Sequence, residues 1–165
     1  MPLTKSEPIT FQEILYDDLG AFCALEVAPQ QQGLVTPNVM TMAEAPYEAG
    51  ALVRGIWLGD RPAGLIAMLR PTAYPEDQDI TIRRDAAYLW RLMVDHKFQG
   101  QGLGNAAVNE ARRTAAAWGY RGITLTAGEG PHSAIPFYQR CGFVLTGRRL
   151  WDDAGEQEMV LWFDG

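Results

Sequence analysis

A run of alternating glycines separates an apolar segment from a helical pattern near the middle of the chain. The run is residues 100–104 (GQGLG), and the apolar segment before it is residues 88–94 (YLWRLMV). Glycine lets the backbone approach a ligand closely because it has no Cβ. The first N–H groups of a helix are free and lie at the positive end of its dipole, so they bind anions. The sequence therefore predicts a strand, a phosphate-binding turn and a helix in succession.

The spacing of these glycines excludes two common phosphate loops. A P-loop needs a Lys-Ser/Thr pair after its glycines, and a dinucleotide fingerprint reads G-x-G-x-x-G, whereas this run reads G-x-G-x-G. Gln99, Gly102 and Gly104 instead match the pattern Q/R-x-x-G-x-G/A. This pattern resembles the pyrophosphate loop of the GNAT acetyltransferases, which bind acetyl-CoA. Glycines in an ordinary turn between a strand and a helix are the alternative.

A second segment further along the chain carries the same resemblance. Residues 134–143 read AIPFYQRCGF and look like the A-x-x-F/L-Y-x-x-x-G-F segment that closes the GNAT core. In that family a short helix carries the tyrosine, here Tyr138, towards the coenzyme sulfur. Core packing explains Phe137 and Phe143, and a half-buried amphipathic ring is the alternative for Tyr138. The order and separation of the two motifs favour the catalytic interpretation of Tyr138.

Composition excludes several other classes of protein. The 165 residues are 47% hydrophobic, which suits one globular domain over residues 1–165 with a sizeable core. No apolar run reaches the ~20 residues of a membrane helix, and residues 1–7 lack a hydrophobic signal segment. Cys23 and Cys141 have no metal-ligand spacing, so we expect reduced thiols, no bound metal and a cytoplasmic location. The net charge of −6 argues against a nucleic-acid partner and is compatible with a cationic substrate.

Hydrophobic periodicity predicts strands alternating with helices along the whole chain. Strands are expected at residues 9–16, 51–58, 63–70, 86–94, 122–126, 143–150 and 157–163, the last two joined by a turn at 152–155. Helices are expected at residues 19–27, from 41 to about 50, from 103 to just before Gly119, and at 133–141. Strand 86–94 is apolar almost throughout, as is typical of a strand buried on both faces. Residues 71–84 form an excursion between strands.

Local signals set the expected ends of the helices. Asp17 or Asp18 is expected to cap the first helix, and Thr41 with Glu44 matches a capping box at the start of the second. In the third helix an apolar stripe faces the sheet, formed by Leu103, Ala107, Val108, Ala111 and Ala115. The resulting order, β-α-α-β-β-β-α-β-α-β-β, is the GNAT order. We therefore predict an α/β (α+β) fold with a mixed central sheet of about seven strands and about four helices.

The N-terminal half resembles bacterial diamine and polyamine (spermidine/spermine) acetyltransferases. Residues 27–38 (VAPQQQGLVTPN) and 42–45 (MAEA) look like the stretch Q-x-x-F-V-x-x-N…L-A-x-A of that subgroup. The resemblance implies that this segment forms one wall of the acceptor site, and an ordinary surface loop is the alternative. We expect Glu26, Gln31 and Asn38 to contact a primary amine, with a polyamine as the acceptor.

The resemblance also implies which residues hold acetyl-CoA. They come from the end of the central strand, from the glycine run and from the segment around Tyr138, and are Leu92, Met93, Val94, Gln99, Gly100, Gln101, Gly102, Leu103, Gly104, Asn105, Ser133 and Phe137. Two positions depart from the family pattern. Gln101 stands where a basic residue is frequent, so one charge contact to the pyrophosphate is in doubt, although Lys97 can compensate. Pro131 replaces an Asn that helps to hold the pantetheine arm.

The implied reaction is direct attack of a neutral amine on the thioester in a ternary complex. The strands ending near Val94 and Thr126 are expected to splay around the pantetheine, with the N–H of Met93 or Val94 polarising the thioester oxygen. Tyr138 is expected to donate a proton to the leaving thiolate.

The sequence leaves the general base and several alternatives open. Asp95, His132, Glu26 and a water molecule are candidates, and for Asp95 a role as turn or cap residue is favoured. An antibiotic or a protein N-terminus is another acceptor class, and a non-catalytic acetyl-CoA sensor is another function. The presence of Tyr138 favours an enzyme. We expect a small-molecule partner and no membrane, and a homodimer is compatible with the sequence.

Overall fold

The computed structural model describes residues 6–151 and 155–164. Within these residues seven strands form a sheet in the order β1-β2-β3-β4-β5-β7-β6. The strands are β1 (Ile9–Gln12), β2 (Leu52–Leu58), β3 (Arg61–Leu69), β4 (Ala87–Val94), β5 (Gly122–Gly128), β6 (Val144–Leu150) and β7 (Glu156–Trp162). Neighbouring strands are antiparallel, apart from β4 and β5, which are parallel. The predicted mixed sheet of seven strands is therefore confirmed.

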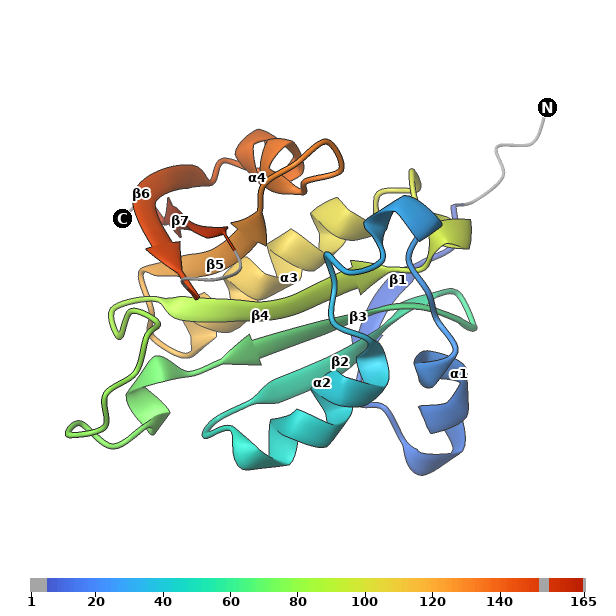
Figure 1. Cartoon of the computed structure of the whole chain (residues 1–165). Helices are drawn as coiled ribbons and strands as arrows, with labels where there is room; N and C mark the ends of the chain where they lie inside the picture. The colour runs from blue at the N-terminus through green and yellow to red at the C-terminus, as the bar shows by residue number, and fades with distance from the viewer. Residues whose placement is uncertain (1–5, 152–154, 165) are drawn as a thin grey trace.

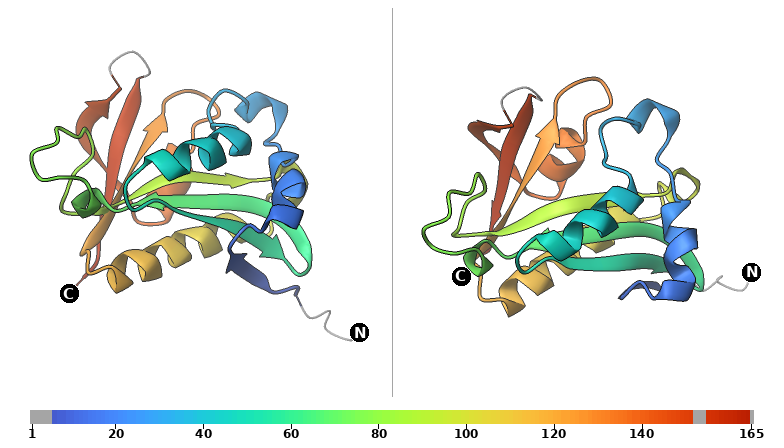
Figure 2. Two further views of the ribbon diagram at one scale, coloured as in Figure 1. Left: turned by 90° about the horizontal axis from the view of Figure 1, so that it is seen from below. Right: turned by 60° about the horizontal axis from the view of Figure 1, so that its bottom comes forward.

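Helices cover both faces of this sheet (Figures 1 and 2). The helices are α1 (Leu19–Cys23), α2 (Asn38–Glu44), α3 (Leu103–Ala117) and α4 (Ile135–Arg140). Helix α3 packs against β4 and β5 on one face, and α1 and α2 lie on the opposite face. The predicted order of helices and strands is confirmed along the described residues.

Two hydrophobic clusters hold these layers together. The larger one buries the predicted stripe of α3 against the sheet, because Leu103, Ala107, Val108, Ala111 and Ala115 are all buried. The alanines have short side chains and let the helix approach the strands closely. The second cluster lies on the other face and centres on Leu65, Ala67 and Met93. Alternate residues of β3 contribute to the two clusters, so this strand is buried on both faces.

The ends of the first two helices differ from the predictions. Helix α1 ends at Cys23 instead of residue 27, because the chain leaves the helix and Leu25 and Val27 pack against the second cluster. Asp17 and Asp18 lie in a 3₁₀ turn, and the side chain of Asp18 makes no capping hydrogen bond.

Helix α2 is shifted towards the N-terminus relative to the prediction. It begins at Asn38, directly after Pro37, and ends at Glu44. Thr41 is buried inside the helix, so the predicted capping box is wrong. The helix stops before Pro46, which lies in a 3₁₀ turn at 45–47, because proline has no N–H to continue the hydrogen-bond ladder.

The turn between β2 and β3 is shorter than the four residues, 59–62, that separate the two predicted strands. Leu58 pairs with Arg61, which leaves Gly59 and Asp60 as the turn residues. Gly59 has a φ of +61°, as the first position of a type II′ hairpin turn requires. Pro62 is accommodated in β3 because the register shifts between Ile56 and Trp57, opposite this residue.

Some predictions concern residues that lie partly outside the part of the chain that the structure describes. Residues 152–154 of the predicted turn lie outside it, although the flanking strands β6 and β7 pair as expected. Residues 1–5 of the N-terminal segment also lie outside it. In the described part of the chain, no helix combines the length and apolarity needed to cross a membrane. The single domain over residues 1–165 stays a prediction.

A glycine in β2 tests the packing of α1 on the sheet. Phe22 is fully buried, and a Cβ added at Gly55 would lie 2.4 Å from its Cζ. We expect Gly55→Ala to lower the free energy of unfolding by about 1–3 kcal/mol, because the ring must move within a packed core. The measurement is urea unfolding followed by circular dichroism.

Gly20→Ala in α1 is the matched control. Nothing lies within 4 Å of its added Cβ, so the free energy of unfolding should stay equal or rise by about 0.5–1 kcal/mol. Equal stability of Gly55→Ala and the wild type would contradict this account of the packing.

Candidate active site

The two parallel strands separate soon after they meet. Among the described residues β4 and β5 pair at two positions, Ala87 with Ile123 and Tyr88 with Thr124, and then diverge (Figure 1). On its other edge β4 carries a bulge at Trp90, because Leu89 pairs with Met68 and Arg91 pairs with the adjacent Ala67. A bulge increases the local twist of a strand. The sheet is therefore open between the carboxyl halves of β4 and β5.

The open edge of β4 presents its own backbone groups. The N–H of Asp95 donates to the carbonyl of Ala63 in β3 at 2.8 Å. Successive N–H groups along a strand point to opposite edges, so the N–H of Val94 points to the open edge. The carbonyl of Val94 points the same way and accepts from Gln99 Nε2 at 3.2 Å. Of Met93 and Val94, it is therefore Val94 that presents an N–H to the gap.

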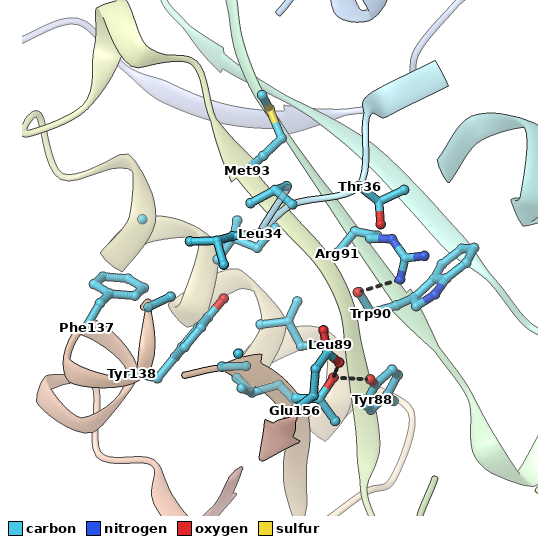
Figure 3. Close-up of a pocket in the computed structure, with 18 of the residues that line it drawn as sticks. Leu34, Thr36, Tyr88, Leu89, Trp90, Arg91, Met93, Phe137, Tyr138 and Glu156 are labelled. Carbon is cyan, nitrogen blue, oxygen red and sulfur yellow. Dashed lines mark hydrogen bonds between the residues drawn. The ribbon is translucent and has the colours of Figure 1, made fainter. Parts of the chain in front are cut away.

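A cavity of about 1080 Å³ occupies this gap. Figure 3 shows Phe137 and Tyr138 on one side of it, and Tyr88, Trp90, Arg91 and Glu156 on the other. The residues predicted to bind acetyl-CoA line this cavity, with the exception of Gln101. Because they line this cavity, residues 90–92 are only half-buried. The prediction that the whole strand is buried on both faces is therefore wrong, since this holds only for the first half of β4.

The glycine run forms a tight turn at the start of α3. Gly100 has a φ of +80° and Gly102, the N-cap residue of α3, has a φ of +84°. This left-handed conformation favours glycine. Nothing lies within 4 Å of a Cβ added at either glycine, so space in front of the loop is open. The first N–H groups of α3 adjoin this space and form a potential anion site.

Two further contacts fix the loop in place. Gln99 Nε2 donates to Gln31 Oε1 at 2.8 Å, which ties the loop to the 3₁₀ turn at 29–31. A Cβ at Gly104 would lie 2.9 Å from Cζ of Phe137, so glycine is needed there for the close approach of α4. Phe137 thus acts as a packing residue that also lines the cavity.

Helix α4 holds Tyr138 against the core with its hydroxyl directed into the cavity (Figure 3). Its ring packs edge-on against Phe137 and Phe143, with centroid distances of 5.1 and 5.6 Å. Burial raises the pKa of Tyr138 above its ordinary value, so the phenol stays protonated. Ser133 Oγ accepts from the N–H of Ile135 at 3.1 Å and donates to the carbonyl of Gly128, which attaches the start of α4 to β5.

A hydrogen-bonded chain of three side chains crosses the opening on its other side (Figure 3). Thr126 Oγ1 donates to Glu156 Oε2 at 2.8 Å, and the hydroxyl oxygens of Tyr88 and Thr126 are 2.9 Å apart. Because a threonine hydroxyl has one proton, Tyr88 is the donor to Thr126. Burial raises the pKa of Tyr88, and the charge of Glu156 raises it further.

Carboxylates outnumber cations on this side of the cavity. Glu44 lies 3.5 Å from Arg91 Nη2, and Glu48 accepts a hydrogen bond from the hydroxyl of Tyr74. Burial, reinforced by this hydrogen bond to Glu48, raises the pKa of Tyr74. Glu156 is the third carboxylate among the lining residues. The charge on this side therefore favours a positively charged ligand.

The residues predicted to contact the acceptor do not come together. Gln31 lines the cavity, whereas Glu26 and Asn38 do not. Asn38 is buried and donates from Nδ2 to the carbonyl of Phe22 at 2.9 Å, so it links α2 to α1. Glu26 has an exposed side chain, and its backbone carbonyl accepts from the N–H of His96 at 2.9 Å.

The candidate bases are also separated. Asp95 is buried and accepts from the N–H groups of Lys97 and Glu26, both at 2.9 Å. It is therefore a cap residue, as the favoured interpretation held, and lies outside the residues that line the cavity. His132 is exposed at the cavity rim.

Several lining residues were missed from the sequence. Arg140, in the last turn of α4, lines the cavity, whereas Lys97 does not. The position of Arg140 inside the F-Y-x-x-x-G-F motif is a sequence signal that could have placed it at the cavity. Glu156 had no such signal, because its place follows from the insertion of β7 between β5 and β6. Among the described residues, no group of three or more His, Cys, Asp or Glu is arranged to hold a metal ion.

Comparisons with solved structures agree with this architecture. An acetyltransferase from Thermus thermophilus matches with a TM-score of 0.71 at 19% identity, over 96% of this chain and 100% of that chain. The PaiA N-acetyltransferase from Thermoplasma acidophilum, in complex with coenzyme A, matches with a TM-score of 0.67 at 13% identity, over 94% and 99% of the two chains. The ribosomal-protein-S18-alanine N-acetyltransferase from Escherichia coli gives 0.67 at 21% identity, over 96% of both. The predicted GNAT fold is confirmed.

Sequence comparisons point the same way. The family model described as acetyltransferase (GNAT) family matches residues 21–143. Human N-acetyltransferase 8 is 32% identical over 95 residues, which are 58% of this chain and 40% of that protein. A peptidyl-lysine N-acetyltransferase of Salmonella typhimurium is 34% identical over 70 residues, which are 42% of this chain and 45% of that protein. The chain thus spans less than half the length of these curated relatives.

Proposed function

The chain belongs to the acetyltransferase (GNAT) family, and from this premise we propose that it transfers the acetyl group of acetyl-CoA to a primary amine of a small molecule. We further propose that this amine is a diamine or polyamine. The observation that carries the proposal is the parting of β4 and β5 beside a glycine turn, with Tyr138 directed into the gap. A cytoplasmic location and a homodimer stay predictions.

The lining residues fit acetyl-CoA. The turn at 100–104 supplies backbone N–H groups and open space for a pyrophosphate. Arg140 supplies a cation on the α4 side of the cavity, which offsets the absence of a basic residue at position 101. The open edge of β4, from Leu92 to Val94, supplies hydrogen-bonding groups for the amides of the pantetheine arm. The structure of the PaiA N-acetyltransferase from Thermoplasma acidophilum, which has a similar fold and is in complex with coenzyme A, supports this assignment.

The proposed reaction forms a C–N bond and breaks the C–S bond of the thioester. The N–H of Val94 is placed to stabilise negative charge on the thioester oxygen. Tyr138 gives its proton to the departing sulfur, and its raised pKa ensures that the phenol carries that proton at neutral pH. The attacking amine must be neutral, so the ammonium form must first lose a proton.

The charge of the cavity supports a cationic acceptor. Three carboxylates, Glu44, Glu48 and Glu156, line it, whereas the lining arginines are Arg91 and Arg140. Exposed ion pairs contribute only ~0–1 kcal/mol each, so selectivity for a polyamine must come from several contacts and from faster association. Gln31, in the segment between α1 and α2, also lines the cavity and is a further polar group for the acceptor.

A protein amine is the second candidate acceptor. The similarity to a peptidyl-lysine N-acetyltransferase and to a ribosomal-protein-S18-alanine N-acetyltransferase favours it. A lysine side chain is also a primary alkylamine, but in a peptide it carries one ammonium instead of several. Separate assays with polyamines and with peptides therefore distinguish the two candidates.

The role of Tyr138 is tested by Tyr138→Phe. We expect kcat to fall about ten-fold or more while the Kd of acetyl-CoA stays the same, because only the proton donor is lost. Wild-type activity should show no loss near pH 10 from ionisation of this tyrosine, since burial raises its pKa. The measurements are thiol release and calorimetry.

Tyr47→Phe is the control, because Tyr47 is 89% exposed. It should leave both quantities unchanged. If Tyr138→Phe also leaves kcat unchanged when chemistry limits the rate, Tyr138 is not the general acid.

The acceptor class is tested by comparing spermidine with a neutral-tailed primary amine of equal length. We expect a higher kcat/KM for spermidine at low salt, and a smaller difference as salt screens the carboxylates. Activity with both amines should rise with pH towards the alkylamine pKa of ~10. Equal kcat/KM values at low salt would contradict the polyamine assignment, and faster acetylation of peptides would favour the protein acceptor.

A further inference from the structure

Glu156 differs from Glu44 in having no cationic partner among the described residues. It differs from Glu48 in its donor, because Thr126 lies on β5 near the point where β4 and β5 part, whereas the donor to Glu48 is Tyr74, in the loop after β3. Glu156 is half-buried at the start of β7 and lines the cavity. Glu44 lies beside Arg91, whereas no cation among the described residues pairs with Glu156. Its described partner is the hydroxyl of Thr126, a neutral donor, at 2.8 Å. A carboxylate held in this way still has the capacity to bind a cation.

The neighbouring acid on the same strand provides a contrast. Glu158 lies two residues further along β7 and is 2% exposed. It accepts from Arg148 Nη1 at 3.0 Å and from Thr146 Oγ1 at 3.0 Å, so its charge is compensated inside the fold. Two carboxylates on one face of a strand therefore have different environments, one closed and structural, the other open to the cavity.

The hydrogen-bonded chain behind Glu156 fixes its orientation. Tyr88 donates to Thr126, and Thr126 donates to Oε2 of Glu156. Both donors come from strands, β4 and β5, at the point where these strands part. A carboxylate anchored through one oxygen by a rigid scaffold leaves its second oxygen free for a ligand.

We propose that Glu156 binds the ammonium group of the acceptor and takes one of its protons, with Thr126 and Tyr88 as positioning residues. This inference rests on the proposed amine acetylation and names the base that the sequence left open. Figure 3 shows Glu156 and Tyr138 facing the same cavity from β7 and from α4. An amine between them has its proton acceptor on one side and the proton donor for sulfur on the other.

The protons of the reaction balance with these two residues. An alkylammonium carries three protons, and the amide product keeps one. Glu156 takes the first proton and releases it to solvent, which leaves a neutral amine whose lone pair attacks the thioester carbon. The nitrogen loses its second proton after attack, and this proton replaces the one that Tyr138 gives to the leaving sulfur. No oxidant, metal or further reactant is required.

The groups around Glu156 define its electrostatic surroundings. They are Tyr88 and Arg91 from β4, Thr126 from β5, Glu158 from β7 with its partner Arg148 from β6, and Trp151 beyond β6. Tyr88 stays protonated because burial raises its pKa. Arg148 offsets the charge of Glu158.

The test is Glu156→Gln, which keeps the shape of the side chain and its capacity to accept from Thr126. Near pH 7 we expect kcat/KM for the amine to fall about 10- to 100-fold, while the Kd of acetyl-CoA stays unchanged. The deficit should shrink as pH approaches ~10, because solvent then supplies the neutral amine that the variant cannot generate. A structural defect would lower kcat/KM by the same factor at every pH.

Two further variants make the outcome unambiguous. Glu129→Gln is the matched control, since Glu129 pairs with Arg149 outside the cavity, and its pH profile should equal that of the wild type. Thr126→Val removes the donor to Glu156 and should give a smaller deficit in kcat/KM that also shrinks as the pH rises.

If Glu156→Gln acetylates amines with wild-type kcat/KM and pH profile, the assignment of Glu156 is overturned while amine acetylation stands. If the wild type releases no thiol with any amine, the proposed function itself fails.

Discussion

The loss of pairing between β4 and β5 is the constraint on which the rest of the structure depends. Two residue pairs join these parallel strands before they diverge. Backbone N–H and C=O groups in a protein interior need partners, so an opened sheet must offer its edge to water or to a ligand. The N–H of Val94 and the carbonyl that holds Gln99 both lie on this edge. An extended ligand with amide groups satisfies such an edge much as an added strand does.

Each side of the opening has its own strand neighbour, and α3 packs against both sides. On one side β4 is held by β3. On the other side β5 is held by β7, and Ser133 attaches α4 to the end of β5. Tyr138 and Glu156 therefore face the cavity from two different elements, α4 and β7, and Glu156 is also linked to β4 through Thr126 and Tyr88.

The residues around the opening use two kinds of recognition. At the start of α3, backbone N–H groups and glycine conformations form the proposed coenzyme site, which needs little charge from side chains. Opposite Tyr138, carboxylates set the charge, and each has its own partner, Arg91 for Glu44, Tyr74 for Glu48 and Thr126 for Glu156. Backbone recognition suits a substrate that never changes, whereas side-chain recognition allows the acceptor to differ between related enzymes. This division explains why the coenzyme side of the site is easier to infer than the acceptor side.

Sequence alone predicted those features that depend on local pattern. The stripe of α3, the glycine turn and the order of strands and helices follow from periodicity and conformational preference over short distances. The end of α1 at Cys23 was missed, because burial of Leu25 and Val27 outweighs helix propensity. Asn38 was assigned to the acceptor, yet it bonds to Phe22, and such a contact across the fold has no local signature. Glu156 was missed because only the strand order brings β7 beside β5.

The most direct test of the central claim is calorimetric titration of acetyl-CoA into the wild type, Gly102→Val and Gly119→Val. Both glycines have positive φ, +84° and +89°, and neither has a neighbour within 4 Å of an added Cβ, so the two substitutions carry similar backbone strain at opposite ends of α3. We predict micromolar binding by the wild type and by Gly119→Val, and binding about ten-fold weaker or worse for Gly102→Val. Wild-type affinity in a folded Gly102→Val protein would contradict the claim that the glycine turn beside the parted strands holds the coenzyme.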